Sequence, residues 1–516
     1  MTIETWWWLL FWTASGLCVG SFLNVVIYRI PLGLSIRHPR RSFCPSCQTP
    51  LQWYDNLPLV SYLRLSGRCR CCGNPISSRY PVIEVATAVV VLLLLDVFFV
   101  GQVREGIYRG AIGLSWRLAE DWPIFLAHVI LFACLLGMSA IDIENYWIDT
   151  AFATRAVIAG FILHGLWTPR HSLASSGGGE GWIRPWDGTA VACVAAFVGL
   201  LAVGIVRRLW GSGGEPDPEP GLPADDAPGA PASAASGESD RVAAETGSFE
   251  AEIQNAESAA APSVPGRRCG RDLLWAWALT GALVVLIVVL AGAARASEHA
   301  APGLRYALPL VGFLVLIIAV GSVARPADAQ VVQAIELERP QARKMVLAEF
   351  ACLLPAILLA VVALLAYARS DPQEGWMVSV LHWAPTRSGG WQPVFGLATA
   401  ATGYVIAAGA GWLIRIVATL IYGKEAFGDG DIYVMAAAGC VAGWPIVVLG
   451  FLMTCVFAVA GVVIMLPFKR ARAIPLVPWL SLSFLATVVF YERLLEFQPV
   501  RTVIELAEIT MSAGNS

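Results

Sequence analysis

The chain has 516 residues and a formal net charge of −3, and 57% of its residues are hydrophobic whereas only 14% are charged. Its mean hydropathy of +0.64 is too high for a water-soluble enzyme built around one or two ordinary cores. These values exclude a simple soluble enzyme and place the chain in a lipid bilayer. There the distribution of Lys and Arg among the loops is more informative than their sum.

About twelve apolar windows are long enough to cross a membrane as helices. No Lys or Arg precedes the first window, which is typical of a retained spanning helix rather than of a secretory signal. The stretch 432–467 is interrupted by Gly443, Trp444 and Pro445, which indicates a hairpin of two spans. The predicted fold class is an all-α polytopic membrane protein, with spans at 6–28, 82–101, 123–141, 151–167, 189–206, 273–294, 305–323, 347–367, 397–422, two within 432–467, and 478–496.

The loop between the first two spans is strongly basic. Residues 29–80 hold eight arginines and a single acid, Asp55. Because basic loops are retained in the cytosol, this loop is predicted to be cytosolic, in a multi-pass membrane protein. Basic residues also occupy the other segments that the span count places in the cytosol: Arg207, Arg208, Arg267, Arg268, Arg271, Arg325, Arg339, Arg343, Lys344, Lys469, Arg470 and Arg472.

Residues 211–266 differ in composition from the rest of the chain. They contain eleven acids and one arginine among Pro, Ala, Gly and Ser, with almost nothing that a core could bury. This composition predicts a disordered acidic linker, and it favours a spacer over a partner-docking tail. The predicted organisation is a first spanning helix at 1–28, a cytosolic four-cysteine loop domain at 29–81, spanning helices at 82–167, an insertion at 168–396 and final spanning helices at 397–500.

The basic loop contains a dense group of cysteines. Two Cys-x-x-Cys pairs, Cys44 with Cys47 and Cys69 with Cys72, are separated by 21 residues and can bring four thiolates onto one zinc ion. Cys71 does not preserve the two-residue gap, so we expect it to be the surplus thiol. The alternatives are a redox-active dithiol and idle cysteines, while a reducing cytosol argues against structural disulfides. Four protein ligands leave no open position, which predicts a structural Zn²⁺ rather than a catalytic one.

Two acids at membrane-span edges are candidates for catalysis, because ionisable residues in such positions are costly. Asp142 ends the third span and Asp431 begins the tenth, and the span count places both on the cytosolic face. Gly428 and Gly430 beside Asp431 permit close backbone approach. Two neighbouring carboxylates can share a proton, as in aspartyl proteases. For three nearby acids, Glu144, Asp149 and Asp429, helix capping is the simpler interpretation. Cation transport through the acids is a further alternative function for the site.

These residues resemble the bacterial prepilin peptidases, which are membrane aspartyl proteases of the Gly-x-Gly-Asp kind. The similarity is carried by GLCVGSFLNVVIYRIP, by CPSCQTPLQWYDNLPLVSYLRLSGRCRCCGNPISSRYPVIE, by the two aspartates and by IPLVP at 474–478. The resemblance implies that Asp142 and Asp431 are catalytic, with Gly428 and Gly430 in the active-site loop. It also implies that zinc is bound by Cys44, Cys47, Cys69 and Cys72.

The resemblance further implies what the chain acts on. Its substrates would be prepilin and pseudopilin precursors, cut at the cytosolic membrane face, and the new N-terminus would then be methylated with S-adenosylmethionine. The expected partners are therefore these precursors and the lipid bilayer, which the resemblance implies is the bacterial inner membrane. No pattern of aromatic and basic residues indicates nucleic-acid binding.

The sequence departs from the family pattern in three places. Ile148 and Asp149 lack the proline that the family places between them, and Tyr433 stands where the family has a lysine. Residues 168–396 separate two segments that the family joins directly. This insertion has an even number of predicted spans, so it returns the chain to the same face. The alternative function is an inactive membrane scaffold of a pilus or type II secretion system.

Overall fold

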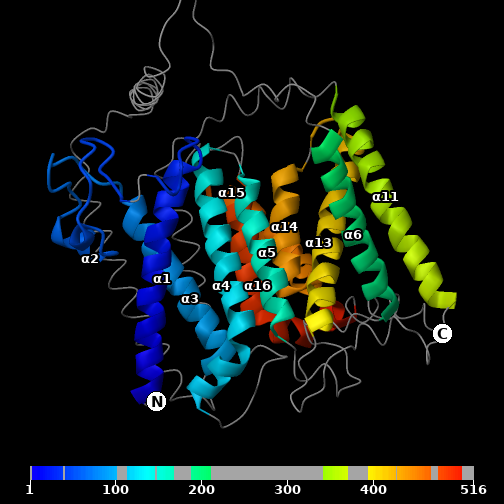
Figure 1. The fold of residues 1–516 in the computed structure, drawn as a ribbon, viewed down its shortest axis with the longest axis horizontal. Helices are drawn as coiled ribbons and strands as arrows, with labels where there is room; N and C mark the ends of the chain where they lie inside the picture. Colours follow the sequence, from blue (N-terminus) through cyan, green and yellow to red (C-terminus); the bar gives the residue numbers. More distant parts are fainter. Residues whose placement is uncertain are drawn as a thin grey trace, which may run out of the picture.

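The computed structural model of the chain shows a bundle of long helices with a small loop region beside one end (Figure 1). Its described part contains no β-strand, and its β structure consists of two isolated bridges in the loop region. This agrees with the predicted all-α fold class. The structure describes residues 3–38, 41–101, 113–145, 148–167, 187–210, 341–369, 393–425, 427–465 and 475–502.

Helices occur at ten of the twelve predicted spans, and the other two predicted spans, 273–294 and 305–323, lie outside the described residues together with the predicted linker 211–266. Seven of the described helices are long and apolar enough to cross a membrane, and two shorter apolar helices accompany them. The helices of the bundle are α1 (Ile3–Arg29), α3 (Arg79–Leu95), α4 (Leu114–Asn145), α5 (Thr150–Gly165), α6 (Asp187–Trp210), α11 (Ala342–Arg369), α13 (Pro393–Tyr422), α14 (Asp429–Ala442), α15 (Trp444–Met465) and α16 (Val477–Glu496).

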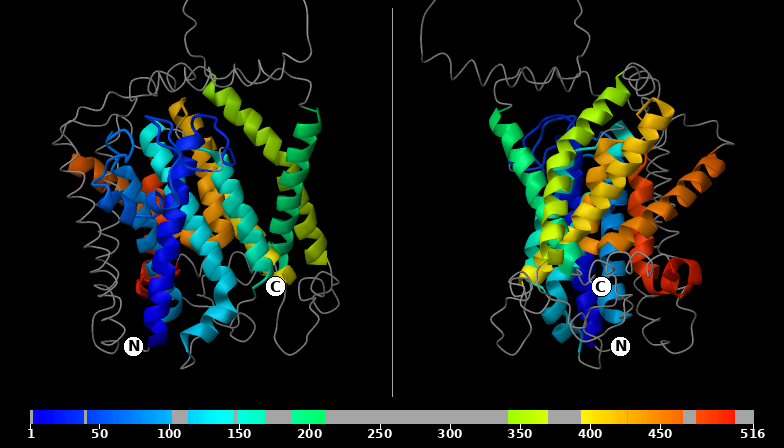
Figure 2. Two further views of the ribbon diagram at one scale, coloured as in Figure 1. Left: turned by 60° about the vertical axis from the view of Figure 1, so that its left-hand side comes forward. Right: turned by 90° about the vertical axis from the view of Figure 1, so that its right-hand side faces the viewer.

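The helices differ in how deeply they are packed. In α3 and α4 about nine-tenths of the apolar window is buried by neighbouring helices, whereas in α11 only 11% is buried. α11 packs mainly along α6, and both lie against α13 at the far side from α1 (Figures 1 and 2). Since the exposed side chains of α11 are mostly leucine, valine and alanine, the outer face of this helix suits contact with lipid.

Successive helices run in opposite directions, so the ends of distant helices meet at one end of the bundle (Figures 1 and 2). The last turns of α4 and α13 lie at the end where α1 leads into the loop region, and α14 starts there as well. The insertion therefore does preserve the meeting of the segments that precede and follow it.

Three details differ from the predicted spans. α4 begins at Leu114, well before the predicted 123, and it accommodates Pro123 within the helix. α3 continues as a π-helical turn, η2 (Asp96–Val100), which the apolar pattern did not indicate. α14 has 14 residues and so rises about 21 Å, less than the roughly 30 Å of a bilayer core. It ends at the predicted break, where Gly443 adopts a positive φ of 93°.

Candidate functional site

Asp142 lies in the last turn of α4 and is buried, with 6% of its surface exposed. Its Oδ2 accepts a hydrogen bond of 3.1 Å from the backbone N–H of Val477, at the start of α16. One turn earlier on α4, Ser139 lies 2.9 Å from Ser481 through their hydroxyl oxygens, which also joins α4 to α16. These contacts fix the carboxylate of Asp142 against an N-terminal helix turn, where unpaired N–H groups favour negative charge.

Asp431 lies in the first turn of α14 and is as buried as Asp142, with 7% exposed. Its Oδ1 is buried without a hydrogen-bond partner in the part of the chain that the structure describes. Gly428 precedes the helix, and a Cβ added there would lie 3.1 Å from Asp431 Oδ2. Glycine at 428 therefore leaves space beside this carboxylate.

The structure brings these two acids together. α4 contacts α14, and Asp142 is close enough for its charge to act on Asp431. A buried polar atom without a partner is costly unless it binds something that the protein does not itself supply. The unpaired oxygen of Asp431, beside a second buried carboxylate, can bind a water molecule or a polar group of a substrate.

Gly430 has a steric role that the sequence did not reveal. A Cβ added at this position would come within 2.7 Å of Ile148 Cδ1 and 2.8 Å of Ile148 Cβ. Ile148 comes just before α5, so the segment after α4 packs directly on the glycine between the two acids of α14. Gly430 thus permits the close approach of two segments that each adjoin a candidate catalytic aspartate.

The three neighbouring acids each have a local partner. Glu144 Oε2 forms an ion pair of 2.6 Å with Arg79 at the start of α3. Asp149 is the N-cap of α5 and accepts a 2.8 Å hydrogen bond from the Ala151 N–H. Asp429 accepts one of 2.8 Å from the Gly430 N–H at the start of α14. Asp149 thus caps a helix, Asp429 bonds within the first turn of α14, and Glu144 forms an ion pair, whereas Asp142 and Asp431 are more deeply buried than these three acids.

The loop after α1 contains two similar turns, each built around one Cys-x-x-Cys pair. In the first, Phe43 and Pro50 form a β-bridge and the Gln48 N–H donates to the Cys44 carbonyl at 2.8 Å. In the second, Arg68 and Pro75 form the bridge. Its corresponding hydrogen bond runs from the Gly73 N–H to the Cys69 carbonyl at 3.0 Å.

The residue after each pair adopts the left-handed conformation, with φ of 56° at Gln48 and 69° at Gly73. Both turns therefore present their two thiols in the same way. The second turn has a glycine here, which adopts this conformation without a steric cost, whereas the first turn has a glutamine, which does so at a cost.

The four sulfur atoms of these turns converge. They all lie within 4.8 Å of one another, with 3.9 Å between Cys44 and Cys72 and 4.0 Å between Cys47 and Cys69. Tetrahedral zinc with Zn–S bonds of about 2.3 Å places its sulfurs about 3.8 Å apart, so this set of donors fits the ion. Cys71 is exposed and is not among the four.

The environments of the four thiols differ. Hydrogen bonding with Thr49 lowers the pKa of Cys47 to about 6, whereas burial raises the pKa of Cys44 to about 12. The cluster thus combines a half-buried thiol that ionises readily with a buried one, and a bound cation would favour the thiolate form of both.

The loop is attached to the bundle through a buried acid. Glu84 of α3 is 6% exposed, and its Oε2 accepts a 2.7 Å hydrogen bond from the Leu59 N–H. Leu59 precedes the short helix α2 (Val60–Arg64) and has a positive φ of 59°. A side-chain acceptor from the bundle therefore satisfies a backbone donor in a strained part of the loop.

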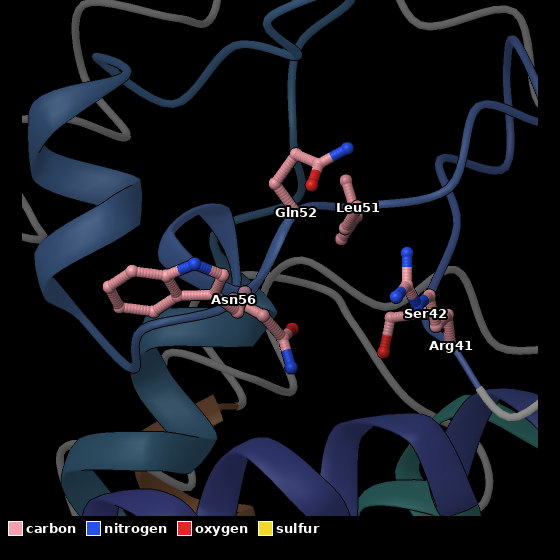
Figure 3. Close-up of a pocket in the computed structure, with 6 residues that line it drawn as sticks. Arg41, Ser42, Leu51, Gln52 and Asn56 are labelled. Carbon is pink, nitrogen blue, oxygen red and sulfur yellow. The ribbon is translucent and has the colours of Figure 1, made fainter.

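Two adjoining cavities lie at the loop. The larger one, between α1 and the loop, has a volume of about 330 Å³, and the smaller one, lined by the loop alone and shown in Figure 3, has about 240 Å³. Arg41, Ser42 and Asn56 line both cavities, while Gln52 and Trp53 line the smaller one. The lining of the smaller cavity therefore combines one cation, several hydrogen-bonding groups and an indole.

The fold and the site define a class of protein: a polytopic helical membrane protein with a four-cysteine loop beside a bundle that encloses a pair of acids. Residues 14–98 match the family model described as the Bacterial Peptidase A24 N-terminal domain. This segment runs from α1 through the cysteine loop to the end of α3.

Several curated proteins are similar to the chain. A prepilin leader peptidase/N-methyltransferase of Klebsiella pneumoniae is 36% identical over 163 residues, which cover 30% of this chain and 62% of the relative. One of Myxococcus xanthus is 38% identical over 148 residues, or 29% and 38% of the two chains. One of Vibrio cholerae is 39% identical over 161 residues, or 30% and 55%.

The chain is therefore similar to these prepilin leader peptidase/N-methyltransferases, and its residues 14–98 match a bacterial peptidase family model. It spans about half the length of the curated relatives that it matches. No solved structure matches it significantly.

Proposed function

We propose that the chain is a membrane aspartic endopeptidase that removes the leader of prepilins and pseudopilins. The observation that carries this proposal is the meeting of two buried carboxylates, Asp142 and Asp431, from opposite sides of the insertion. The relatives named prepilin leader peptidase/N-methyltransferase supply the class of substrate. The basic loop after α1 supports a cytosolic orientation of this end of the bundle.

The geometry suits proton transfer between a water molecule and a peptide carbonyl. Two carboxylates at close range hold one proton between them. The ionised carboxylate removes a proton from water, and the resulting hydroxide attacks the scissile carbonyl carbon. The protonated carboxylic acid donates its proton to the carbonyl oxygen. When the tetrahedral intermediate collapses, the C–N bond breaks, the leaving amine takes up the proton that came from water, and a hydroxyl proton of the intermediate returns to the carboxylate that had donated its own.

Each aspartate has a feature that serves this cycle. The Val477 N–H holds one oxygen of Asp142 in place, which fixes the direction of its other oxygen. The unpaired Oδ1 of Asp431 is available to water or substrate. Gly428 keeps a side chain away from the Asp431 carboxylate, which leaves space beside it for a substrate.

Zinc has a structural role in this proposal. Cys44, Cys47, Cys69 and Cys72 would hold the ion with no open position for water, so the ion would stabilise the loop without taking part in hydrolysis.

The relatives' names support a second activity, methylation of the new N-terminal amine. S-adenosylmethionine supplies a methyl group for this reaction. The two adjoining cavities fit such a molecule, because Arg41 offers a cation for its carboxylate and Trp53 an indole for its base. Both cavities lie within residues 14–98, the segment matched by the family model. We place the methyl donor there, with Gln52 and Asn56 as hydrogen-bonding groups.

The peptidase is tested with the purified full-length protein in liposomes and a prepilin precursor, with leader release followed by mass spectrometry. We expect cleavage by the wild type and a loss of at least about 1,000-fold in Asp142→Asn and in Asp431→Asn. Asp149→Asn, at an acid that caps α5, is the matched control and should keep most of the rate. Failure of the wild type to cut any of several precursors would return the chain to the inactive-scaffold alternative.

The donor site is tested separately by the binding of S-adenosylmethionine to the same preparation. Trp53→Ala should weaken binding at least about 10-fold while leader cleavage continues. Equal binding by Trp53→Ala and the wild type would remove the cavities from methylation.

A further inference from the structure

A buried arginine lies where the insertion meets the candidate active site. Arg415, in α13, has only 3% of its side chain exposed. Its Nε and one terminal nitrogen donate to the two carboxylate oxygens of Glu349 in α11, each at 3.1 Å. This two-point pairing fixes the plane of the guanidinium group as well as its position.

The third nitrogen of Arg415 faces the segment that joins α13 to α14. It forms an ion pair with Glu425 and donates a hydrogen bond to the backbone carbonyl of Phe427. Phe427 immediately precedes Gly428, with which the Gly-x-Gly-Asp motif begins. One guanidinium group therefore joins α11 to the backbone that leads into Asp431.

α11 contacts the same segment at a second place. Arg343, in its first turn, lies beside Gly423, and a Cβ added to that glycine would come within 3.3 Å of the Arg343 guanidinium. Gly423 follows the last residue of α13 and has a positive φ of 67°, so it turns the chain out of the helix. One end of the path from α13 to the Gly-x-Gly-Asp motif thus lies against α11, and the other end is joined to α11 through Arg415.

Opposite charges hold Arg415, Glu349 and Glu425 together. A buried guanidinium is stable only when its donors are paired, and Arg415 has two carboxylates and a carbonyl for this purpose. Each of the two glutamate side chains is 25% exposed, so either can be changed with less disruption than the arginine itself. Loss of Glu349 would leave two donors of Arg415 without their partner and release the guanidinium from α11.

We propose that α11 is a functional part of the active site: Glu349, acting through Arg415, positions the segment at 423–428 and thereby Asp431. This inference rests on the proposed peptidase function. It assigns a role to the insertion, whose helix α11 lies outside the segment matched by the family model. Glu349 and Arg415 are positioning residues, since neither touches the reacting atoms.

The test uses the full-length protein in liposomes with three variants of α11 and one of α13. Glu349→Gln removes the charge at nearly constant size, and Glu349→Ala removes the contact. Lys344→Gln removes an exposed charge from the same part of α11 and is the matched control. Arg415→Lys retains the charge of the buried group but not the paired donors. We expect kcat to fall about 10-fold in Glu349→Gln and more in Glu349→Ala, with KM changed less than about twofold. The reason is that these variants displace the segment that positions Asp431 but leave the residues that bind the substrate in place.

A second readout does not depend on cleavage. Hydrogen–deuterium exchange at residues 423–428 should be at least about fivefold faster in both Glu349 variants and in Arg415→Lys than in the wild type. Exchange in α3 and α4 of these variants should match that of the wild type. The Lys344→Gln protein should match the wild type at every position. Faster exchange confined to this segment, together with a lower kcat, is the result that supports the proposal.

The two readouts separate failure of this inference from failure of the proposed function. If the wild type cleaves precursors and the Glu349 variants match Lys344→Gln in both kcat and exchange, the inference is overturned and the peptidase remains. If the wild type cleaves no precursor, the proposed function fails and with it the catalytic part of the inference. Faster exchange at 423–428 would then still support the positioning contact, and unchanged exchange would overturn that as well.

Discussion

The cysteine loop and the paired acids are assembled in opposite ways. The loop places its four sulfurs by short-range structure, with each Cys-x-x-Cys pair held by a β-bridge and a hydrogen bond within the same turn. The acid pair depends on contacts between distant helices, namely α4, α14 and α16. A local change in the loop should therefore remain local, whereas the acid pair should respond to changes in segments that contain neither aspartate.

Loss of a zinc ligand should give the largest effect and test whether the loop is independent of the bundle. Cys44→Ser and Cys69→Ser should each abolish stoichiometric zinc binding and unfold residues 41–76, because metal binding supplies the folding free energy of such loops, about 10–16 kcal/mol. Zinc content by mass spectrometry and limited proteolysis measure this. Cys71→Ser, at an exposed thiol outside the cluster, should retain both zinc and protease resistance. Equal zinc loss in all three variants would contradict the assignment of ligands.

A methyl group at Gly430 should test the dependence of the acid pair on its neighbours. Gly430→Ala forces the chain against Ile148, so we expect kcat for leader cleavage to fall about 100-fold, or about 2.7 kcal/mol. Ile148→Ala in the same chain should restore part of the rate by removing the clash. Gly409→Ala in α13, where an added Cβ has nothing within 4 Å, is the control. A fully active Gly430→Ala would show that Ile148 does not hold this segment.

Part of each of these two sites could be predicted from the sequence. The spacing of the cysteines was enough to choose Cys69 and Cys72 over Cys71, because knuckle geometry is local and depends on residues a few positions apart. Asp142 and Asp431 could be paired by counting spans, since helices that alternate in direction return acids at corresponding ends to one face. The structure has now placed both sets together, although their roles in catalysis and zinc binding remain proposals.

The contacts that tertiary packing creates were not predictable. The approach of Ile148 to Gly430, the Val477 N–H on Asp142 and the pairing of Glu349 with Arg415 all join segments whose separation in sequence carries no periodic signal. The π-helical turn η2 was missed because a continuous run of apolar residues does not distinguish a π-helix from an α-helix. The break at Gly443 was predicted, but it was not recognised that the helix before it, α14, is shorter than a bilayer core.

Removal of the hydrogen bond between Glu84 and Leu59, which joins the cysteine loop to the bundle, should have a smaller effect. Glu84→Ala leaves the Leu59 N–H without its acceptor and should destabilise the docking of the loop by about 1–3 kcal/mol. Protease cleavage within residues 57–66 should become faster while zinc remains bound. Glu84→Gln retains an acceptor oxygen and should lie between the alanine variant and the wild type. Identical cleavage in all three proteins would show that the Glu84 contact does not anchor the loop.

The smallest effect concerns the difference between the two cysteine turns. Gln48 adopts the left-handed conformation that Gly73 adopts without a steric cost, so Gln48→Gly should stabilise the first turn by up to about 1 kcal/mol. Slower release of zinc to a chelator measures this stabilisation. Gly73→Gln should have the opposite effect on the second turn. Faster release from Gln48→Gly would contradict the role assigned to its backbone conformation.

The central claim is that Asp142 and Asp431 act as one catalytic unit, and the most direct test is to compare leader cleavage by Asp142→Asn, Asp431→Asn and the double variant. Groups that act together are non-additive, so we predict that all three variants show the same residual rate, at least about 1,000-fold below the wild type. Zinc content should be unchanged in each, which shows that the loop remains folded. A single variant that retains the wild-type rate, or losses that multiply in the double variant, would contradict the claim.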